Sequence, residues 1–409
     1  MSRFSGKAGL SGYSGISGQS GASENEQHTK INITMKKNIL LTIALATIAI
    51  GAMGQDKKFQ TYTHEKPYQV ETIKPTTGKK VKNVVLMIGD GMSLMHIQAA
   101  WTCNRGHLWL ENAMYTGLSE TPATDRLVTD SGSGGTSLAT GHKTVYHAVG
   151  VDPLNRELTT LVDLAKAAGK DAGVAVTCRL WDATPGDFLG HNIDRDEEED
   201  IVGDYPGSNV DFVFGGGYRQ FIHRKDGRNI FNELEAKGYH ISHSVDEMMS
   251  YEGARQWCVP FEVDTPLPDE RGDMLAQATL CGMNLMKKDN KKGFFMMVEG
   301  SQLDDYGHFN KLDMLMKETL DFDQTIGAVM KWAEQDGETL VIVTADHETG
   351  GMTVHGGELA EGKVVCHFSS KDHTGTMVPV YAYGPGSEHF TGFYSNTDIF
   401  WKIKYLMGM

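Results

Sequence analysis

The chain has 409 residues, of which 40% are hydrophobic and 22% charged, a mixture that excludes a disordered or fibrous protein. Its formal net charge of −15 argues against nonspecific binding to nucleic acid or to anionic lipid. If the protein acts on an anion, metal ions are one candidate source of the positive field that the chain as a whole lacks.

Two segments precede the part of the chain that we expect to fold. Residues 1–34 are rich in Ser and Gly, and we expect this low-complexity leader not to pack. Residues 35–54 have the parts of a secretory signal peptide: a basic head, the apolar run Ile39–Ile50 and small residues before Gln55. Because a signal peptide begins a chain, we interpret Met35 as the true start. We therefore expect a periplasmic or secreted protein with no stable membrane anchor after cleavage. The alternative is an N-terminal anchor that is never cut.

Residues 55–409 are expected to form a single domain in which short apolar runs alternate with helical stretches. The helices Thr159–Ala168 and Leu312–Gln335 are each followed closely by a glycine that suits a C-terminal cap. The alternation predicts an α/β fold with a mostly parallel central sheet and helices on both faces. Residues from about 204 to 271, rich in Gly, His and charge, are expected to be an insertion. The apolar runs, typical of buried parallel strands, are Val84–Ile88, Gly173–Thr177, Phe212–Phe214, Phe294–Val298, Thr339–Val343 and Val378–Tyr383.

Cysteine usage adds one exclusion. The five cysteines are an odd number without CxxC spacing, which excludes a zinc ribbon and allows at most two disulfides. Disulfides are therefore not expected to be the framework that stabilises the fold.

Acidic residues follow three of the apolar runs, at the edge where open α/β sheets bind their ligands. Asp90 follows the first run, Glu299 follows the run from Phe294, and Asp346-His347 follows the run from Thr339. A single Asp at a strand end is most often a helix N-cap. Three carboxylates together are costly unless cations neutralise them, so the sequence predicts a metal site.

Two further motifs carry possible metal ligands. Asp304 and His308 are four residues apart, which puts both on one face of a helix, although such pairs are frequent on ordinary helix surfaces. His373 lies in a polar loop before the last apolar run, where a solvated histidine is the simpler interpretation. Neither motif identifies a site by itself.

Two motifs suit the binding of an anion. Asp130-Ser131 followed by small residues suits a helix N-terminus, whose free N–H groups attract anions; a flexible Ser/Gly loop explains the same pattern equally well. The motif is neither a P-loop nor a GxSxG elbow. Arg195 lies within an acidic run, where it balances charge or, if it points into a site, binds two phosphate oxygens with its planar fork.

In this order along the chain, from near Asn83 to about Pro385, the motifs resemble the alkaline phosphatases, which are secreted, metal-dependent phosphomonoesterases. So many motifs in the family's order are specific, whereas any one of them alone is not. The motifs are Ile88-Gly89-Asp90-Gly91-Met92, Asp130-Ser131 with Thr140-Gly141, Asp182-Ala183-Thr184-Pro185, Arg195, Val298-Glu299-Gly300, Asp304 with His308, Thr344-Ala345-Asp346-His347 and His373-Thr374-Gly375.

The resemblance implies two zinc ions and one magnesium ion as cofactors. Histidine with carboxylate suits zinc, whereas an all-oxygen set suits magnesium. The implied ligands are Asp304, His308 and His373 for a first zinc; Asp90, Asp346 and His347, with Ser131, for a second; and Glu299 and Thr184, with Asp90 bridging, for magnesium.

The resemblance also implies the reaction. Ser131 would attack a small phosphate monoester and form a phosphoserine, whose hydrolysis releases inorganic phosphate. Arg195 would hold the nonbridging oxygens, and Asp182 would orient Arg195 and a magnesium-bound water. Asp130 and Asp305 would lie beside the metal ligands without binding a metal ion themselves.

Three features depart from the family's pattern. Asp305 stands where Lys, His or Trp is frequent, so we expect weaker phosphate binding unless its side chain turns to solvent. The segment between His347 and His373 is short, which predicts a small crown insertion and leaves both a homodimer and a monomer open. Glycines stand where Ala-like residues often begin the helix after the serine, which predicts a looser first turn; they are Gly132, Gly134 and Gly135.

Two other functions stay open at this point: a phosphodiesterase of the same superfamily, and a phosphate-binding or metal-binding protein that does no chemistry. A diesterase would lack the magnesium triad and the phosphate-holding arginine, yet Thr184, Glu299 and Arg195 are present. Pure binding has no use for a nucleophile such as Ser131. A sulfatase is excluded because Cys103-Asn104-Arg105 lacks the Cys/Ser-x-Pro-x-Arg motif.

Overall fold

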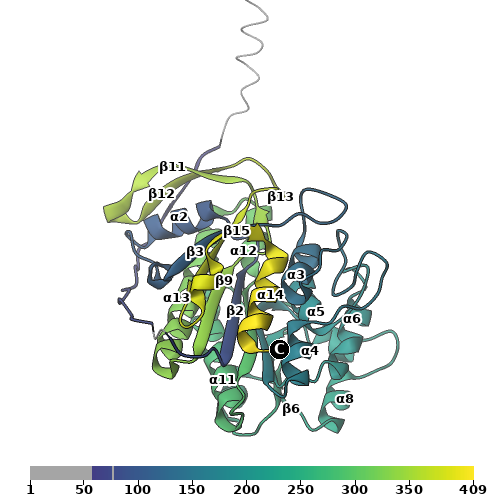
Figure 1. The fold of residues 1–409 in the computed structure, drawn as a ribbon. Helices are drawn as coiled ribbons and strands as arrows, with labels where there is room; N and C mark the ends of the chain where they lie inside the picture. Colours follow the sequence, from purple (N-terminus) through teal and green to yellow (C-terminus); the bar gives the residue numbers. More distant parts are fainter. Residues whose placement is uncertain (1–57, 76–77) are drawn as a thin grey trace, which may run out of the picture. The chain divides into compact units, whose positions relative to one another are not determined.

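The computed structural model describes residues 58–75 and 78–409, and Figure 1 shows their fold. The expected leader and signal peptide, residues 1–34 and 35–54, lie outside the described residues. In the described part, no helix combines the length and the apolar character needed to cross a membrane. The five cysteines all fall within it, and none is paired with another.

A sheet of ten strands runs through the molecule, and nine of its strands point the same way. Apolar, β-branched runs such as Val84–Ile88 form its centre, where they are covered on both faces. The expected mostly parallel sheet is therefore confirmed, with one correction: Val378–Tyr383 forms a strand that is antiparallel to both of its neighbours. In sheet order the strands are β15 (Gly392–Ser395), β3 (Tyr115–Glu120), β14 (Val378–Tyr383), β9 (Thr339–Thr344), β2 (Asn83–Gly89), β8 (Phe294–Gly300), β4 (Asp171–Arg179), β5 (Phe212–Gly216), β7 (Gln256–Cys258) and β6 (His240–Ser242).

Helices cover both faces of the sheet, as the alternating pattern predicts (Figure 1). Successive side chains of a strand point to opposite faces. In β2, Val84, Leu86 and Ile88 join one hydrophobic core, whereas Val85 and Met87 join the other. The first core packs beneath α3 (Ser131–Thr140), α4 (Leu161–Ala167), α5 (Ala183–Leu189) and α14 (Asn396–Met407); the second packs beneath α2 (Leu94–Cys103), α11 (Met274–Asp289), α12 (Gln302–His308) and α13 (Leu312–Asp336).

The two helices expected from the sequence are α4 and α13. Thr160 caps the start of α4 by accepting a hydrogen bond from the backbone N–H of Asp163. Gly337 ends α13 with a φ of 72°, a left-handed conformation that glycine adopts without a steric penalty.

Residues 204–271, expected to be an insertion, contribute three strands to one edge of the central sheet. β5, β7 and β6 are parallel there, and the buried Trp257 of β7 belongs to the first core. Short helices lie between and beside these strands: α7 (Arg219–Ile222) and α8 (Ile230–Ala236) connect β5 to β6, α9 (Val245–Ser250) connects β6 to β7, α6 (Glu198–Asp204) precedes β5, and α10 (Pro268–Arg271) follows β7.

Small strands follow the end of β9 and carry the chain to His373. β11 (Met352–Glu358) and β12 (Lys363–Phe368) form a hairpin that pairs with β1 (Gln60–Thr63). β10 (Glu348–Thr349) pairs with β13 (His373–Thr374), which brings His373 back beside the end of β9. This small sheet lies where the sequence predicts a small crown (Figure 1).

A buried ion cluster joins α10 to α13. The guanidinium of Arg271 donates to Glu318 at 2.5 Å and 3.2 Å and to Asp321 at 2.7 Å, and the Arg271 and Glu318 side chains are almost fully buried. We expect Arg271→Met to lower the free energy of unfolding by about 3–5 kcal/mol, because it leaves two buried carboxylates without their counter-charge. Thermal unfolding checks this, with Arg228→Met as the control.

Arg228 is an exposed arginine paired with Glu233 at 2.8 Å, so its loss should cost less than about 1 kcal/mol. An Arg271→Met protein as stable as the unmodified one would contradict the prediction.

Candidate metal centre and nucleophile

The carboxyl ends of four adjacent parallel strands, β9, β2, β8 and β4, meet at one edge of the sheet. Asp90 follows β2, Glu299 is the second-to-last residue of β8, and Asp346-His347 lies just after β9. All four side chains are buried or nearly so. The topology therefore brings together the acidic residues that the sequence places after separate strands.

The side chains of Asp304, His308 and His373 converge from α12 and β13. His308 Nε2 lies 3.2 Å from one carboxylate oxygen of Asp304, and His373 Nε2 lies 3.5 Å from the other. The two Nε2 atoms are 3.0 Å apart. The helical spacing of Asp304 and His308 thus places both side chains at one site. His373 joins them there, although it lies 65 positions beyond His308 in the chain.

Both histidines of this group are oriented by backbone carbonyls. His308 Nδ1 donates to the carbonyl of Lys371 at 2.7 Å, and His373 Nδ1 donates to that of Thr129 at 2.8 Å. A carbonyl only accepts, so each Nδ1 carries the proton and each Nε2 presents a lone pair to the cluster. Two lone pairs and a carboxylate that face one another form a donor set suited to a cation such as zinc.

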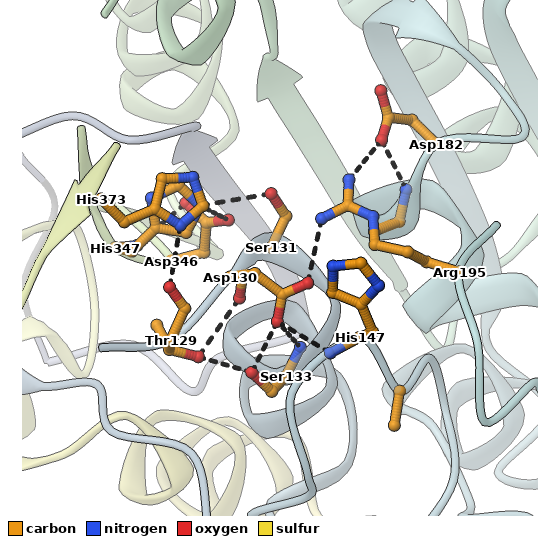
Figure 2. Close-up of polar contacts among 12 residues, drawn as sticks. Thr129, Asp130, Ser131, Ser133, His147, Asp182, Arg195, Asp346, His347 and His373 are labelled. Carbon is orange, nitrogen blue, oxygen red and sulfur yellow. Dashed lines mark hydrogen bonds and ion pairs between the residues drawn. The ribbon is translucent and has the colours of Figure 1, made fainter. Parts of the chain in front are cut away.

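A second group lies beside the first. His347 Nε2 is 3.4 Å from Asp90 Oδ1 and 3.3 Å from Asp346 Oδ2, and the His347 and Asp346 side chains have no exposed surface. Ser131 Oγ is 3.2 Å from the same Nε2 atom. The His347 ring stacks on that of His373 with centroids 3.7 Å apart, so the two groups are contiguous, as Figure 2 shows.

A third set of donors consists of oxygen atoms alone. Thr184 Oγ1, Glu299 Oε1 and Asp90 Oδ1 are buried and have no hydrogen-bond partner among the described residues. Burial, with Asp346 and Asp182 nearby, raises the pKa of Glu299 to about 8, and burial with neighbouring carboxylates raises that of Asp90 well above its usual value. Buried oxygens that have no hydrogen-bond partner and lie among other carboxylates fit a bound hard cation such as magnesium.

Ser131 is the first residue of α3, so the sequence's alternative of a flexible loop is wrong. Asp130 is the N-cap and accepts from the backbone and side chain of Ser133 at 3.2 Å and 2.8 Å. Although burial opposes it, the charge of Arg195 and these hydrogen bonds lower the pKa of Asp130 to about 2. The nucleophile candidate thus sits at a capped helix start, where backbone N–H groups favour an anion.

The glycines of α3 allow close packing rather than a looser first turn. A Cβ on Gly134 would lie 2.8 Å from the carbonyl oxygen of Asp346. A Cβ on Gly135 would lie 2.1 Å from the carboxylate of Asp187 on α5. Because no larger residue fits at this distance, the helix that begins with Ser131 rests directly against the backbone beside the second group.

Arg195 points into the site (Figure 2). Its guanidinium donates to Asp130 Oδ2 at 3.1 Å and to Asp182 Oδ1 at 2.7 Å. Burial opposes its charge, but the two carboxylates hold its pKa above the ordinary value. The acidic run left two roles open for Arg195: balancing charge, or binding phosphate oxygens. In the structure Arg195 faces Ser131 rather than solvent, which is the position that the second role requires.

Asp305 follows Asp304 on α12 and is half-buried, so its side chain does not turn fully to solvent. Burial and the charges of Asp182 and Asp304 raise its pKa to about 6.

Sequence reasoning missed several residues around the site. Arg179 pairs with Asp182 at 3.0 Å and with Asp264 at 3.2 Å. Thr349 donates to Asp304 and lies 3.2 Å from His347 Nδ1, so it contacts a ligand candidate from each group. The Arg179–Asp264 contact spans 85 residues, and no local pattern signals it.

A family model described as alkaline phosphatase matches residues 81–367 of this chain. Among proteins of known activity, alkaline phosphatase 4 of Bacillus subtilis is 29% identical, over 89% of this chain and 95% of its own length. Alkaline phosphatase H of Pseudomonas aeruginosa is 30% identical, over 80% of this chain and 85% of its own length.

Solved structures agree with these sequence matches. The alkaline phosphatase of the Antarctic bacterium TAB5 is 35% identical and superimposes with a TM-score of 0.76, over 81% of this chain and 99% of that one. The cold-active alkaline phosphatase of a psychrophilic Shewanella species is 27% identical with a TM-score of 0.73, over 80% of this chain and 99% of that one.

Proposed function

The chain belongs to the alkaline phosphatase family and hydrolyses phosphate monoesters, and from this premise we propose that it does so through a phosphoserine at Ser131, in a site for two zinc ions and one magnesium ion. The observation that carries the proposal is the position of Ser131 Oγ, 3.2 Å from His347 Nε2 and at the start of a helix that Arg195 faces.

The donor chemistry supports this set of ions. Asp304, His308 and His373 would hold the first zinc, and Asp90, Asp346 and His347 the second, because each group combines imidazole with carboxylate. Thr184 and Glu299, with Asp90, would hold magnesium through oxygen alone. A variant of the TAB5 enzyme binds magnesium in a site called M3. When bound, the zinc ions supply Lewis-acid stabilisation of the negative charge that develops on oxygen.

Ser131 performs the covalent step. Its Oγ forms a bond to phosphorus while the bond from phosphorus to the alcohol oxygen breaks, and the alcohol leaves. Water then cleaves the phosphoserine, which restores Ser131 and releases inorganic phosphate. Backbone N–H groups at the start of α3 that have no partner within the helix would stabilise the charge of the phosphoryl oxygens.

Arg195 favours monoesters over diesters. Its fork binds two nonbridging oxygens, and these carry more negative charge in a monoester dianion than in a diester, whose two nonbridging oxygens share a single charge. Asp130 and Asp182 hold the guanidinium in place from two sides, so its orientation is set before the substrate arrives (Figure 2).

Hydrolysis of a nitrophenyl phosphate monoester, compared with that of the bis-nitrophenyl diester, tests the proposal on purified protein. We expect the monoester to react much faster and chelator to stop the reaction. Faster hydrolysis of the diester would favour a phosphodiesterase, and a protein that binds phosphate but hydrolyses neither ester would favour a binding function.

The expectation that the protein is exported rests on the composition of residues 35–54 rather than on the fold. We propose that this signal peptide directs the protein to the periplasm or beyond the cell and is then removed. The protein recovered after export should begin at Gln55. Peptide mapping of its N-terminus checks this, and exported protein that retains residues before Met35 would contradict it.

An apolar face supports a homodimer. Three hollows of about 260, 340 and 520 Å³ adjoin one another around α2, β3, β14 and β15, and they contain two charged residues, Glu111 and Glu120. In a two-fold interface each surface meets its own copy, so a nearly uncharged face avoids repulsion. Its apolar lining residues include Leu94, Trp101, Leu118, Leu127, Tyr381, Met377 and Phe393.

Light scattering on the purified protein tests the dimer. We expect twice the mass of one chain, and Phe393→Asp should halve it because it places a charge in an interface beside its own copy. A single-chain mass for the unmodified protein at micromolar concentration would contradict the proposal.

A further inference from the structure

One guanidinium outside the phosphate-binding position is surrounded by three carboxylates. Arg179, at the end of β4, donates through one terminal nitrogen to Asp182 Oδ2 at 3.0 Å and through the other to Asp264 Oδ1 at 3.2 Å. Its backbone N–H also donates to Asp264, at 2.9 Å. Asp305 lies near enough for each side chain to affect the other's charge. Arg179 is therefore the cation that balances this acidic corner of the site.

Asp182 is shared between Arg179 and Arg195. Its Oδ2 accepts from Arg179, while its Oδ1 accepts from Arg195 at 2.7 Å and from the backbone N–H of Ala183 at 2.8 Å. Arg195 continues to Asp130, the residue before Ser131. An unbroken series of alternating charges thus runs from Arg179 to the start of α3.

We propose that Arg179 is a positioning residue for phosphate: it fixes the carboxylate of Asp182 so that Asp182 in turn holds Arg195 toward the phosphoryl oxygens. The proposal rests on the phosphate-binding role proposed above for Arg195. Without Arg179, the charge of Asp305 would push the Asp182 carboxylate away from its present orientation, and Arg195 would lose one of its two supports.

The charge balance points in the same direction. Removing Arg179 leaves Asp264 and Asp305 without their nearby cation and Asp182 with Arg195 as its one remaining cationic partner, next to a site that must receive an anion. At roughly 8–10 Å through an effective dielectric near 20, partly screened by solvent, this change should weaken phosphate binding about tenfold. Conversely, Asp305→Lys should tighten phosphate binding about fivefold, because it turns a negative charge beside the site into a positive one.

The test measures the dissociation constant of inorganic phosphate by calorimetry in a metal-loaded Ser131→Ala background, where no turnover occurs. Arg179→Gln should bind phosphate about tenfold more weakly than the background protein. Adding Asp305→Lys to Arg179→Gln should bring the constant back to within about threefold, because a cation again stands next to Asp182. Arg228→Gln, at an exposed ion pair away from the site, is the matched control and should bind phosphate as the background does.

A second comparison distinguishes a role of Arg179 in positioning Asp182 from a role in holding the 259–267 loop in place. Asp264→Asn removes the negative charge that pairs Arg179 with the 259–267 loop but leaves the contact of Arg179 with Asp182. Positioning predicts that Asp264→Asn keeps phosphate affinity, whereas a purely structural anchor predicts a loss as large as that of Arg179→Gln. If Arg179→Gln does not fold, Arg179→Lys replaces it and should lose affinity by less, because it keeps the charge but not the fork.

Three results would overturn the proposal: unchanged phosphate affinity in Arg179→Gln, no recovery in the double variant, or an equal loss in Asp264→Asn. The proposed function is judged separately, by whether the unmodified protein hydrolyses the monoester and the Ser131→Ala protein does not.

Discussion

Replacing Ser131 with alanine is expected to lower kcat on a phosphate monoester by about a thousandfold or more, the usual consequence of removing a nucleophile. The physical reason is the position of its Oγ, 3.2 Å from His347 Nε2 in a buried group of carboxylates and histidines. Ser131 is the first residue of α3, and alanine at this position leaves no hydroxyl at the start of the helix. Steady-state kinetics on a nitrophenyl monoester measures the loss.

Two controls make this result specific. Metal analysis of Ser131→Ala should give the same content as the unmodified protein, because the histidine and carboxylate ligands proposed here are intact. Ser137→Ala, on the same helix, removes a hydroxyl that donates only to the backbone of Ser133 and should retain turnover within a few fold. A Ser131→Ala protein with undiminished kcat would show that another group is the nucleophile.

Removing divalent ions is the second change with a large expected effect. Dialysis against a chelator should lower monoester turnover by about a hundredfold or more, since Lewis-acid stabilisation is worth several kcal/mol and each 1.4 kcal/mol is a factor of ten. The melting temperature should fall as well, because Asp90, Glu299 and Asp346 then face one another without a neutralising charge. Zinc should restore activity, and magnesium should add to it.

Measuring stability beside activity keeps this experiment informative. Glu299→Gln should reduce the response to magnesium while leaving zinc content unchanged, because the magnesium set proposed here depends on its carboxylate. Full activity after dialysis, in protein shown by elemental analysis to contain no metal, would refute the three-ion proposal.

Much of the site could be predicted from the sequence because its ligands follow local rules. A carboxylate at the end of a buried parallel strand reaches the carboxyl edge of the sheet, and β2, β8 and β9 deliver Asp90, Glu299 and Asp346 to that edge. Asp304 and His308 share a helix face because four residues make about one turn. Apolar runs and glycine caps likewise determined the central strands and both expected helices.

The tertiary structure alone decided the features that depend on long-range packing. Val378–Tyr383 has the composition of a parallel strand, yet it runs antiparallel because of how the chain returns from the small sheet beside β9. The series from Asp264 through Arg179 and Asp182 to Arg195 joins residues up to 85 positions apart. Charged side chains of this kind occur on any surface, and a sequence does not show which of them become partners. Composition and periodicity record what each segment prefers, whereas ion pairs and close helix contacts depend on distances that exist only after the segments have packed.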